Sequence, residues 1–589
     1  MVGESRRWMI LVATTWIQAF TGTNLDFSSY SSHLKSVLGI SQLQLNYLSV
    51  ASDLGKAFGW CCGVSLFYLP LCLLLFMAAF MGLLGYGLQW LLIQRLISLP
   101  YVLVFLICLL AGCSISWFNT LCYVLCIQHF PSNRPLALSL TTGFNGVSAA
   151  LYTLIANAIN PHNDSLYLSL NALVPLSIST LALVPILLQP PPQNPSSDTV
   201  RSDSLIFLLL NGIAVFTGLY LLLLDSLSYN TYNVSVARIL LGGAILLLVL
   251  PLSLPGIIYS HGWACQTSHS SSNMGEVEFL ELQKELIGSR ATNMNFNSTS
   301  TDDDHPTSTD DDHPTGTDDD HPTSTDDDSN DIAYSAQEKQ GCCEVVTRKD
   351  QLVRLGEEHP AWMLVRRWDF WLYYIAYLCG GTIGLAYSNN LGQISESLGY
   401  SSETNMIVTL YSACSFFGRL LSAAPDFLKN KVYFARTGWL AVALVPTPLA
   451  FFWLALSGSK IALHAGTGLI GLSSGFVFAA AVSITSELFG PNSTGVNHNI
   501  LITNIPLGSL LYGLLAALVY DSNIESSKQK VLIGEAMVCM GRQCYQQTFF
   551  WWGCISLLGL ACSFSLFLRT RPAYDHFERN RKQRESEFF

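Results

Sequence analysis

Long apolar stretches recur along the whole chain, and each is roughly twenty residues long, which is the length that a helix needs to cross a bilayer. A helix also satisfies its own backbone hydrogen bonds in lipid. We place eight such stretches before the middle of the chain and six after it, at 8–27, 43–64, 70–90, 100–128, 136–158, 168–188, 205–224, 236–259, 370–391, 404–424, 437–455, 461–488, 500–520 and 549–569. The sequence therefore predicts an all-α polytopic membrane protein with about 14 transmembrane helices.

A strongly acidic stretch separates the two groups of apolar segments. Residues 301–328 read TDDDHPTSTDDDHPTGTDDDHPTSTDDD, a repeat that contains twelve aspartates. A segment without apolar side chains cannot bury enough surface to offset the entropy of ordering, so we predict disorder for residues 298–331. Its histidines (His305, His313 and His321) could bind a divalent cation weakly, but a solvated spacer is the simpler interpretation. We therefore predict no metal site and no cofactor.

The distribution of lysine and arginine predicts the orientation. With a cytosolic N-terminus, the cytosolic segments hold Arg6, Arg7, Arg134, Arg201, Arg366, Arg367 and the basic tail RTRPAYDHFERNRKQR. The opposite side is poorer in these residues, which agrees with the positive-inside rule. We expect both termini and the acidic stretch in the cytosol, and the protein itself in the plasma membrane or an endomembrane.

Two further features belong to the predicted non-cytosolic side. Asn163 in NDS and Asn233 in NVS are acceptor sequences for N-glycosylation. Cys539 and Cys544 share one predicted loop there, where a short disulfide could form.

Short sequence matches across the acidic stretch indicate a duplication. LKSVLGIS (34–41) is similar to ISESLGYS (394–401), and DLGKAFG (53–59) is similar to FFGRLLS (416–422). Two parallel six-helix halves joined by a long cytosolic link are the architecture of major facilitator transporters. We predict an N-terminal half at 1–190, an extra helix pair at 200–260, a cytosolic linker at 261–365, a C-terminal half at 366–570 and a basic tail at 571–589.

The N-terminal sequence RRWMILVATTWIQAFTGTNLDFSSYSSHLKSVLGISQLQLNYLSVASDLGKAFGW resembles the start of the plant nodulin-like family of major facilitator proteins. SFFGRLLSAAPDFL and FFWLALSG resemble the C-terminal half of its nuclear-fusion-defective branch. GRLLSAAPD is also similar to a cytosolic-loop motif of monocarboxylate and oxalate/formate-type carriers, with Gly418, Arg419 and Asp426 on the matching positions. The first half lacks the Gly-x-x-x-Asp-Arg-x-Gly-Arg run that other facilitators carry after their second helix. The resemblance implies transport without naming a substrate.

Ionisable residues inside a membrane are costly and are usually functional or paired. Asp53 and Lys56 are three residues apart, so they share one helix face, either as a gate or as a structural ion pair. Arg419 matches Lys56 in the second half, and we expect Asp426, about two helical turns further on, to be its partner. The remaining candidates for the transport path or its gates are Asn24, Asp26, Tyr387, Asn389 and Asn390, for which hydration at a helix end is the alternative.

Small residues also recur along two predicted helices. One of them carries Gly143, Gly146 and Ala150, and the other carries Gly466, Gly471 and Gly475. Small residues let helices approach closely, which suits either an interface that slides or static packing.

The sequence contains no P-loop, no H-E-x-x-H and no G-x-S-x-G, so we do not expect an enzyme. We predict a secondary-active transporter that moves a small polar solute or an organic anion by alternating access. Proton coupling is an option, and we expect a monomer that contacts lipid and no nucleic acid. A receptor or scaffold that uses the same fold without transport is the alternative.

Overall fold

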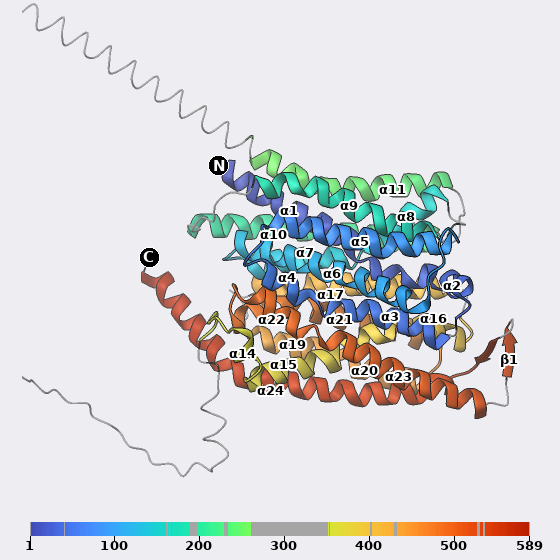
Figure 1. The fold of residues 1–589 in the computed structure, drawn as a ribbon. Helices are drawn as coiled ribbons and strands as arrows, with labels where there is room; N and C mark the ends of the chain where they lie inside the picture. The colour runs from blue at the N-terminus through green and yellow to red at the C-terminus, as the bar shows by residue number, and fades with distance from the viewer. Residues whose placement is uncertain are drawn as a thin grey trace, which may run out of the picture. The chain divides into compact units, whose positions relative to one another are not determined.

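The structure is a computed structural model, and it describes residues 2–40, 42–160, 163, 165–188, 197–228, 234–258, 260, 352, 354–400, 403–428, 433–526, 530–533 and 536–587. The residues before 260 and after 349 form one compact unit, which is almost entirely helical (Figure 1). The acidic stretch lies outside the described residues, so its predicted disorder stays a prediction.

The first part of the unit contains the helices that precede the acidic stretch. Their bounds are α1 (Val2–Thr21), η1 (Thr23–Asp26), α2 (Phe27–Leu38), α3 (Gln42–Lys56), α4 (Gly59–Ser65), α5 (Leu71–Ile93), α6 (Tyr101–His129), α7 (Arg134–Asn145), α8 (Ser148–Ile159), α9 (Leu166–Leu187), α10 (Ser197–Ser228), α11 (Val234–Val249) and η2 (Leu250–Leu252). We call this part the first half.

The second part contains α14 (Ala361–Leu364), α15 (Trp368–Tyr377), the π-helical turn η3 (Leu378–Thr382), α16 (Ile383–Ser397), α17 (Thr404–Leu421), α18 (Ala424–Leu428), α19 (Arg436–Leu444), α20 (Pro446–Leu456), α21 (Lys460–Phe489), α22 (Thr494–Leu501), α23 (Asn504–Ser526) and α24 (Gln543–Glu587). A short antiparallel hairpin of β1 (Lys530–Ile533) and β2 (Ala536–Cys539) precedes α24. We call this part the second half. The sequence patterns did not predict the hairpin.

Ten helices of the described residues are long and apolar enough to cross a membrane. The predicted count of about 14 is therefore not confirmed. The four predicted segments that do not qualify (8–27, 43–64, 136–158 and 370–391) contain the shorter or more polar helices α1, α3, α7 and α16. Each of these four segments carries or adjoins residues of the candidate site described below, which is a physical reason for their lower hydropathy.

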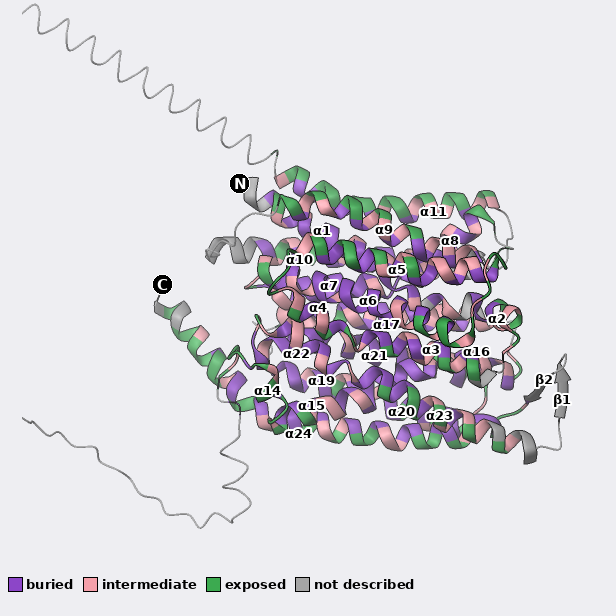
Figure 2. Cartoon of the chain, viewed as in Figure 1, coloured by how far each residue is buried: buried purple, intermediate pink, exposed green. Residues whose placement is uncertain are grey.

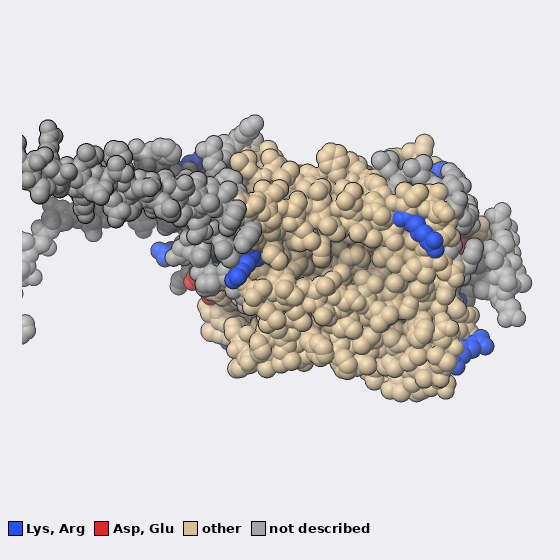
Figure 3. All heavy atoms as spheres, turned by 90° about the horizontal axis from the view of Figure 1, so that it is seen from above, with Lys and Arg blue, Asp and Glu red and all other residues tan. Residues whose placement is uncertain are grey.

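The side chains that point away from the bundle are large and apolar. Phe76, Leu181, Phe216, Leu449 and Leu558 are all at least half exposed. Buried residues gather on the central helices, whereas outer helices such as α11 and α24 expose one face (Figure 2). One face of the molecule has a broad central band without charged side chains, with lysine and arginine near its ends (Figure 3). Such a band is the surface that a bilayer covers.

The helix pair α10 and α11 packs on the outside of α1, α7 and α8. Arg7 of α1 forms an ion pair with Asp203 of α10 at 2.6 Å, and Arg238 of α11 donates to the carbonyl oxygen of Ala158. Gly218 of α10 lies directly against the ring of Phe416 in α17. The pair therefore contacts both halves.

The two ends of the bundle can be told apart in Figure 1. The N-terminal end of α1 and the C-terminal end of α24 lie at one end, which we call the termini end. The β1–β2 hairpin lies at the other, which we call the hairpin end.

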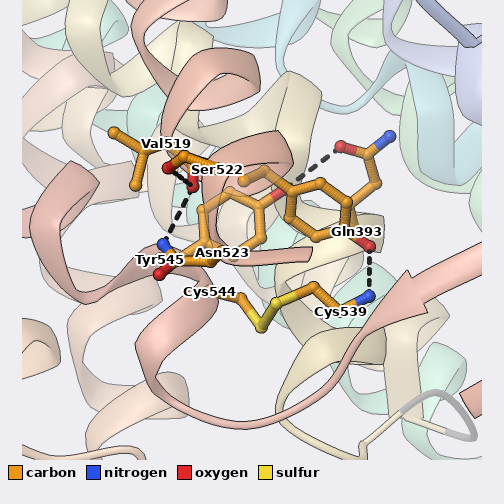
Figure 4. Close-up of a disulfide and its surroundings, with 8 residues drawn as sticks. Gln393, Val519, Ser522, Asn523, Cys539, Cys544 and Tyr545 are labelled. Carbon is orange, nitrogen blue, oxygen red and sulfur yellow. Dashed lines mark hydrogen bonds between the residues drawn. A yellow bond between two sulfur atoms is a disulfide. The ribbon is translucent and has the colours of Figure 1, made fainter. Parts of the chain in front are cut away.

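A disulfide joins Cys539 and Cys544 at the hairpin end (Figure 4). The backbone N–H of Cys539 donates to the Tyr520 hydroxyl, and the Tyr545 hydroxyl donates to Gln393 Oε1 in α16. The loop that carries the disulfide is thereby fixed to α23 and α16.

Candidate functional site

The first predicted transmembrane segment is interrupted where its polar residues lie. α1 ends at Thr21, and the chain passes through Gly22 and the single turn η1 before α2 begins. A side chain at Gly22 would meet the carbonyl oxygen of Asn145 and the side chain of Ser148, both at 2.7 Å. Only glycine allows this close approach between α1 and the junction of α7 and α8.

Asp26 closes η1 and is buried, with 1% of its surface exposed. Neither of its carboxylate oxygens has a hydrogen-bond partner in the described part of the chain. Burying an ionised carboxylate without a partner costs several kcal/mol.

A small cavity of about 20 Å³ lies beside η1. Its lining comes from α2, α3, α5 and α6 of the first half and from α16 of the second: Asn24, Phe27, Tyr30, Leu48, Ser49, Ser52, Asp53, Tyr86, Gln89, Cys108, Ala111 and Asn389. Because α2, α3 and α16 lie toward the hairpin end in Figure 1, the cavity lies on that side of the bundle centre. Three predicted residues, Asn24, Asp53 and Asn389, therefore share one cavity.

Asp53 and Lys56 form a buried ion pair, with 2.7 Å between Lys56 Nζ and Asp53 Oδ1. The other carboxylate oxygen of Asp53 accepts a hydrogen bond of 2.6 Å from the hydroxyl of Ser509 in α23. The pair is therefore also a bridge between the two halves. Its role in gating stays a prediction.

Arg419 does not pair with Asp426, so this expectation was wrong. Arg419 Nη1 instead donates to the carbonyl oxygen of Thr142 at 2.9 Å and to Asn145 Oδ1 at 3.1 Å, both in α7 of the first half. The expectation assumed one continuous helix, in which residues seven apart share a face. The helix is interrupted after Leu421, and Pro425 lies at the start of the short α18.

Asp426 belongs to a separate charge cluster at the termini end. It accepts from Arg436 at 2.7 Å, and Arg436 also donates to Glu487 at 2.9 Å. The hydroxyl of Tyr574 donates to the second oxygen of Glu487. All four residues lie in the second half, so this cluster ties that half together.

The carbonyl oxygen that Arg419 binds is free because the fifth predicted segment is broken. α7 ends at Asn145, and the N–H of Gly146 turns back to Gly143 at 2.8 Å instead of bonding to Thr142. An unpaired carbonyl inside a protein is costly and is usually satisfied by another donor. Arg419 supplies that donor from the opposite half.

The halves also meet on the termini side of the cavity. A side chain at Gly63 in α4 would collide with the carbonyl of Gly495 in α22. Asn499 of α22 donates to the Thr120 hydroxyl in α6 at 2.8 Å. Between the cavity and the termini end, the halves are thus in direct contact.

The predicted glycines have two different roles. Gly143 and Gly146 face Leu420 and Phe416 of the opposite half, at 3.0 and 3.2 Å from an added Cβ. Gly471 and Gly475 instead pack on α17 within the second half. The first pair lies at an interface between the halves and the second pair does not.

Two other predicted residues lie away from the cavity lining. The Tyr387 hydroxyl shares a 2.7 Å hydrogen bond with Thr467, within an aromatic cluster of the second half. Asn390 donates to the carbonyl oxygen of Ala386 on its own helix. Whether either residue belongs to the transport path stays a prediction.

The sequence analysis missed several residues of this region. Asn145, Ser509, Asn499 and Gln89 are polar, lie in apolar helices and contact the other half or the cavity. The sequence signal that could have identified them is an isolated polar side chain, mostly an amide, within an otherwise apolar stretch. The described residues contain no cluster of side chains able to hold a metal ion.

The two predicted glycosylation sites differ in what the structure describes. Asn163 is exposed, and its side-chain oxygen accepts from Ser165. Asn233 lies outside the described residues.

Comparison with known proteins places these features in context. Residues 7–256 match a family model described as Nodulin-like, and residues 354–576 match one described as NFD4, C-terminal domain. Protein NUCLEAR FUSION DEFECTIVE 4 of Arabidopsis thaliana is 52% identical over 99% of this chain and 92% of its own length. A "Probable transporter mch1" of Neurospora crassa is 28% identical over 23% of this chain and 22% of its own length.

Among solved structures, the major facilitator protein XylE, a proton:xylose symporter, superposes with a TM-score of 0.51. The match covers 97% of each chain at 11% identity, so it bears on the fold alone.

Proposed function

Because the chain belongs to the nodulin-like family, with the C-terminal domain of its nuclear-fusion-defective branch and the major facilitator fold, we propose that it moves a small polar solute or organic anion across its membrane by alternating access. The fold is that of a transporter, and the predicted resemblance is confirmed. The solute and the mechanism are the proposed part.

The observation that carries the proposal is the asymmetry of the contacts between the halves. They touch through Gly63 and Gly495 on the termini side of a polar cavity, and Arg419 and Asp53 bridge them at two further places. In alternating access such contacts separate when the cavity opens to the other side. With the predicted orientation, this structure corresponds to a state closed toward the cytosol.

We further propose that Asp26 carries the coupling proton. Its carboxyl group is buried, has no partner in the described part of the chain, and adjoins a break between α1 and α2. Movement of the halves that admits water to this break would stabilise the ionised form and release the proton. Buried polar side chains are mostly hydrogen-bonded, so an unpartnered carboxyl group is unusual for an aspartate with only a structural role.

The test is uptake into proteoliposomes that contain the purified full chain, with a panel of labelled sugars, polyols, amino acids and carboxylates. The expected result is saturable uptake of at least one compound, driven by an inward proton gradient. Asp26→Asn should abolish the response to the gradient while counterflow of the same compound continues, because exchange needs no net proton movement. Asn211→Ala is the control, because Asn211 is a buried polar side chain of α10 that bonds within its own helix and does not line the cavity; this variant should keep the gradient response.

A receptor or scaffold without transport is the second candidate. No structural observation favours it, because such a protein needs neither a polar cavity nor a reversible contact between its halves. Absence of flux for the whole panel, together with locked halves in cross-linking experiments, would support that alternative.

A further inference from the structure

The cavity has a polar lining that is almost free of unbalanced charge. Its one ionisable acid, Asp53, is already neutralised by Lys56 and by the hydroxyl of Ser509. Among the described residues, no lysine, arginine or histidine lines the cavity. An organic anion bound here would leave water without a cation to replace its hydration, which is strongly unfavourable.

Several lining groups instead have unused hydrogen-bonding capacity. Gln89 is 1% exposed and donates to the carbonyl oxygen of Gly85 at 3.0 Å, but its side-chain oxygen has no partner in the described part of the chain. The side chains of Asn24, Ser49 and Asn389 make no hydrogen bond with any described residue. A buried acceptor without a donor is costly, so a ligand that brings donors would be stabilised here.

The rest of the lining is apolar and partly aromatic. The rings of Phe27, Tyr30 and Tyr86 lie on the first-half side of the cavity. Small-molecule sites combine such apolar walls with a few convergent polar groups. The cavity is small in this state, at about 20 Å³, so a solute would enter only when the cavity widens. The lining therefore suits an occupant with apolar ring faces and several hydrogen-bond donors.

We infer that the cavity, once widened, binds a neutral, polyhydroxylated solute, and that the Gln89 side-chain oxygen accepts a hydrogen bond from one of its hydroxyl groups. This inference rests on the proposed function, since the cavity is taken as the place where the transported solute binds. Of the two substrate classes proposed above, small polar solutes and organic anions, the inference keeps only the first. Gln89 is then a specificity-determining residue.

The test is direct binding to the purified full chain, measured by calorimetry with D-xylose, D-mannitol and myo-inositol as neutral ligands. Lactate and malate represent carboxylates, and putrescine represents amines. At least one neutral compound should bind, whereas the carboxylates and the amine should not. Gln89→Leu should weaken that binding roughly fivefold to tenfold, which is the loss of one neutral hydrogen bond.

Asn211→Leu is the matched control. Asn211 of α10 is also buried and makes the same kind of bond, from its side-chain nitrogen to the carbonyl oxygen of Phe207 at 2.8 Å, but it does not line the cavity. It should leave the dissociation constant unchanged. Should Gln89→Leu fail to fold, Ser49→Ala, at another lining residue, replaces it, with a similar expected loss.

The outcomes separate this inference from the proposed function. Preferential binding of a carboxylate or of putrescine, no binding of any neutral compound, or equal affinity in Gln89→Leu would each overturn the inference. Flux of a carboxylate would do so while leaving the transport function standing. Binding of a neutral compound without flux would support the inference and contradict transport.

Discussion

Arg419 of α17 donates a 2.9 Å hydrogen bond to the carbonyl oxygen of Thr142 in α7, across the interface between the halves. The acceptor is a carbonyl that the break between α7 and α8 leaves without its helical partner. The same break receives Gly22 of the interrupted first segment on its other side. The break between α7 and α8 thus packs against the backbone at Gly22, near Asp26, and accepts a hydrogen bond from Arg419 of the second half.

Arg419→Ala should therefore impair flux strongly while the protein still reaches the membrane. A hydrogen bond to a charged group contributes about 1.5–3 kcal/mol, and its loss from one conformation alone shifts the balance between states by about ten- to a hundredfold. Flux and surface abundance are the measurements. Arg571→Ala, at a side chain that is 61% exposed, is the control and should change neither. Normal flux in Arg419→Ala would remove this contact from the mechanism.

Lys56→Ala should lower the stability of the protein and reduce its flux. Its removal leaves Asp53 buried without its cation, and breaking a buried ion pair costs about 3–5 kcal/mol. The double variant Asp53→Ala/Lys56→Ala should recover part of the thermal stability, because no unpaired charge remains. Lys56→Arg should be milder than Lys56→Ala. Unfolding temperatures and flux of the single and double variants form the cycle, and strictly additive losses would show that the two residues do not interact.

The sequence patterns predicted those features of the fold that depend on residues close together in the chain. The apolar stretches located the helices because membrane insertion depends on length and hydropathy, and the three-residue spacing of Asp53 and Lys56 was enough to bring them together. The predicted equivalence of Lys56 and Arg419 agrees with the packing around them. Gly55 lies against the carbonyl oxygen of Leu109, and Gly418 lies against the carbonyl oxygen of Leu472. Both residues of the second contact are 363 positions after their counterparts in the first.

The partner of Arg419 could not be found in the same way. Its acceptor exists only because α7 stops at Asn145, and that interruption coincides with the approach of Gly22 from α1. Neither contact is encoded in the spacing of residues along one helix. The cavity is likewise a product of packing, since Gln89 and Asn389 come from helices some 300 residues apart in sequence.

Two glycines on the same predicted segment should respond differently to alanine. A methyl group at Gly55 would collide with the α6 backbone inside the first half, so Gly55→Ala should lower the unfolding temperature. A methyl group at Gly63 would collide with the carbonyl of Gly495 in the other half. Gly63→Ala should leave the fold intact but disfavour the contact on the termini side, by about 1–3 kcal/mol.

Labelling of a cysteine placed in the cavity, in the background of each variant, measures this difference. With cytosolic-side reagent, Gly63→Ala should label faster than the parent protein at an unchanged unfolding temperature. A loss of stability equal to that of Gly55→Ala, without faster labelling, would mean that the Gly63 contact does not open during function.

The orientation is tested by glycan mapping. Asn163 and Asn233 should face the lumen or exterior, and Asn297 and Asn492 the cytosol. Asn492 lies beside Glu358, which accepts from its N–H, between α21 and α22 at the termini end. A glycan sensitive to endoglycosidase at Asn297 or Asn492 would reverse the assignment, whereas a bare Asn163 would be uninformative because its loop lies close to the helix ends.

The Cys539–Cys544 disulfide gives an independent measure of the same orientation. It closes a loop with a sequence separation of five residues, for which chain entropy gives a stabilisation of about 2 kcal/mol. In the predicted orientation the loop faces an oxidising compartment, where the bond persists. Reduction with dithiothreitol should therefore lower the unfolding temperature of the purified protein. The double variant Cys539→Ser/Cys544→Ser should start from that lower temperature and should not respond to the reductant.

Labelling in intact cells tests the orientation directly. Both cysteines should resist maleimide until reductant is added. Rapid labelling without reductant would place the loop in the cytosol, and a reductant response that persists in the double variant would assign the effect to another pair of cysteines.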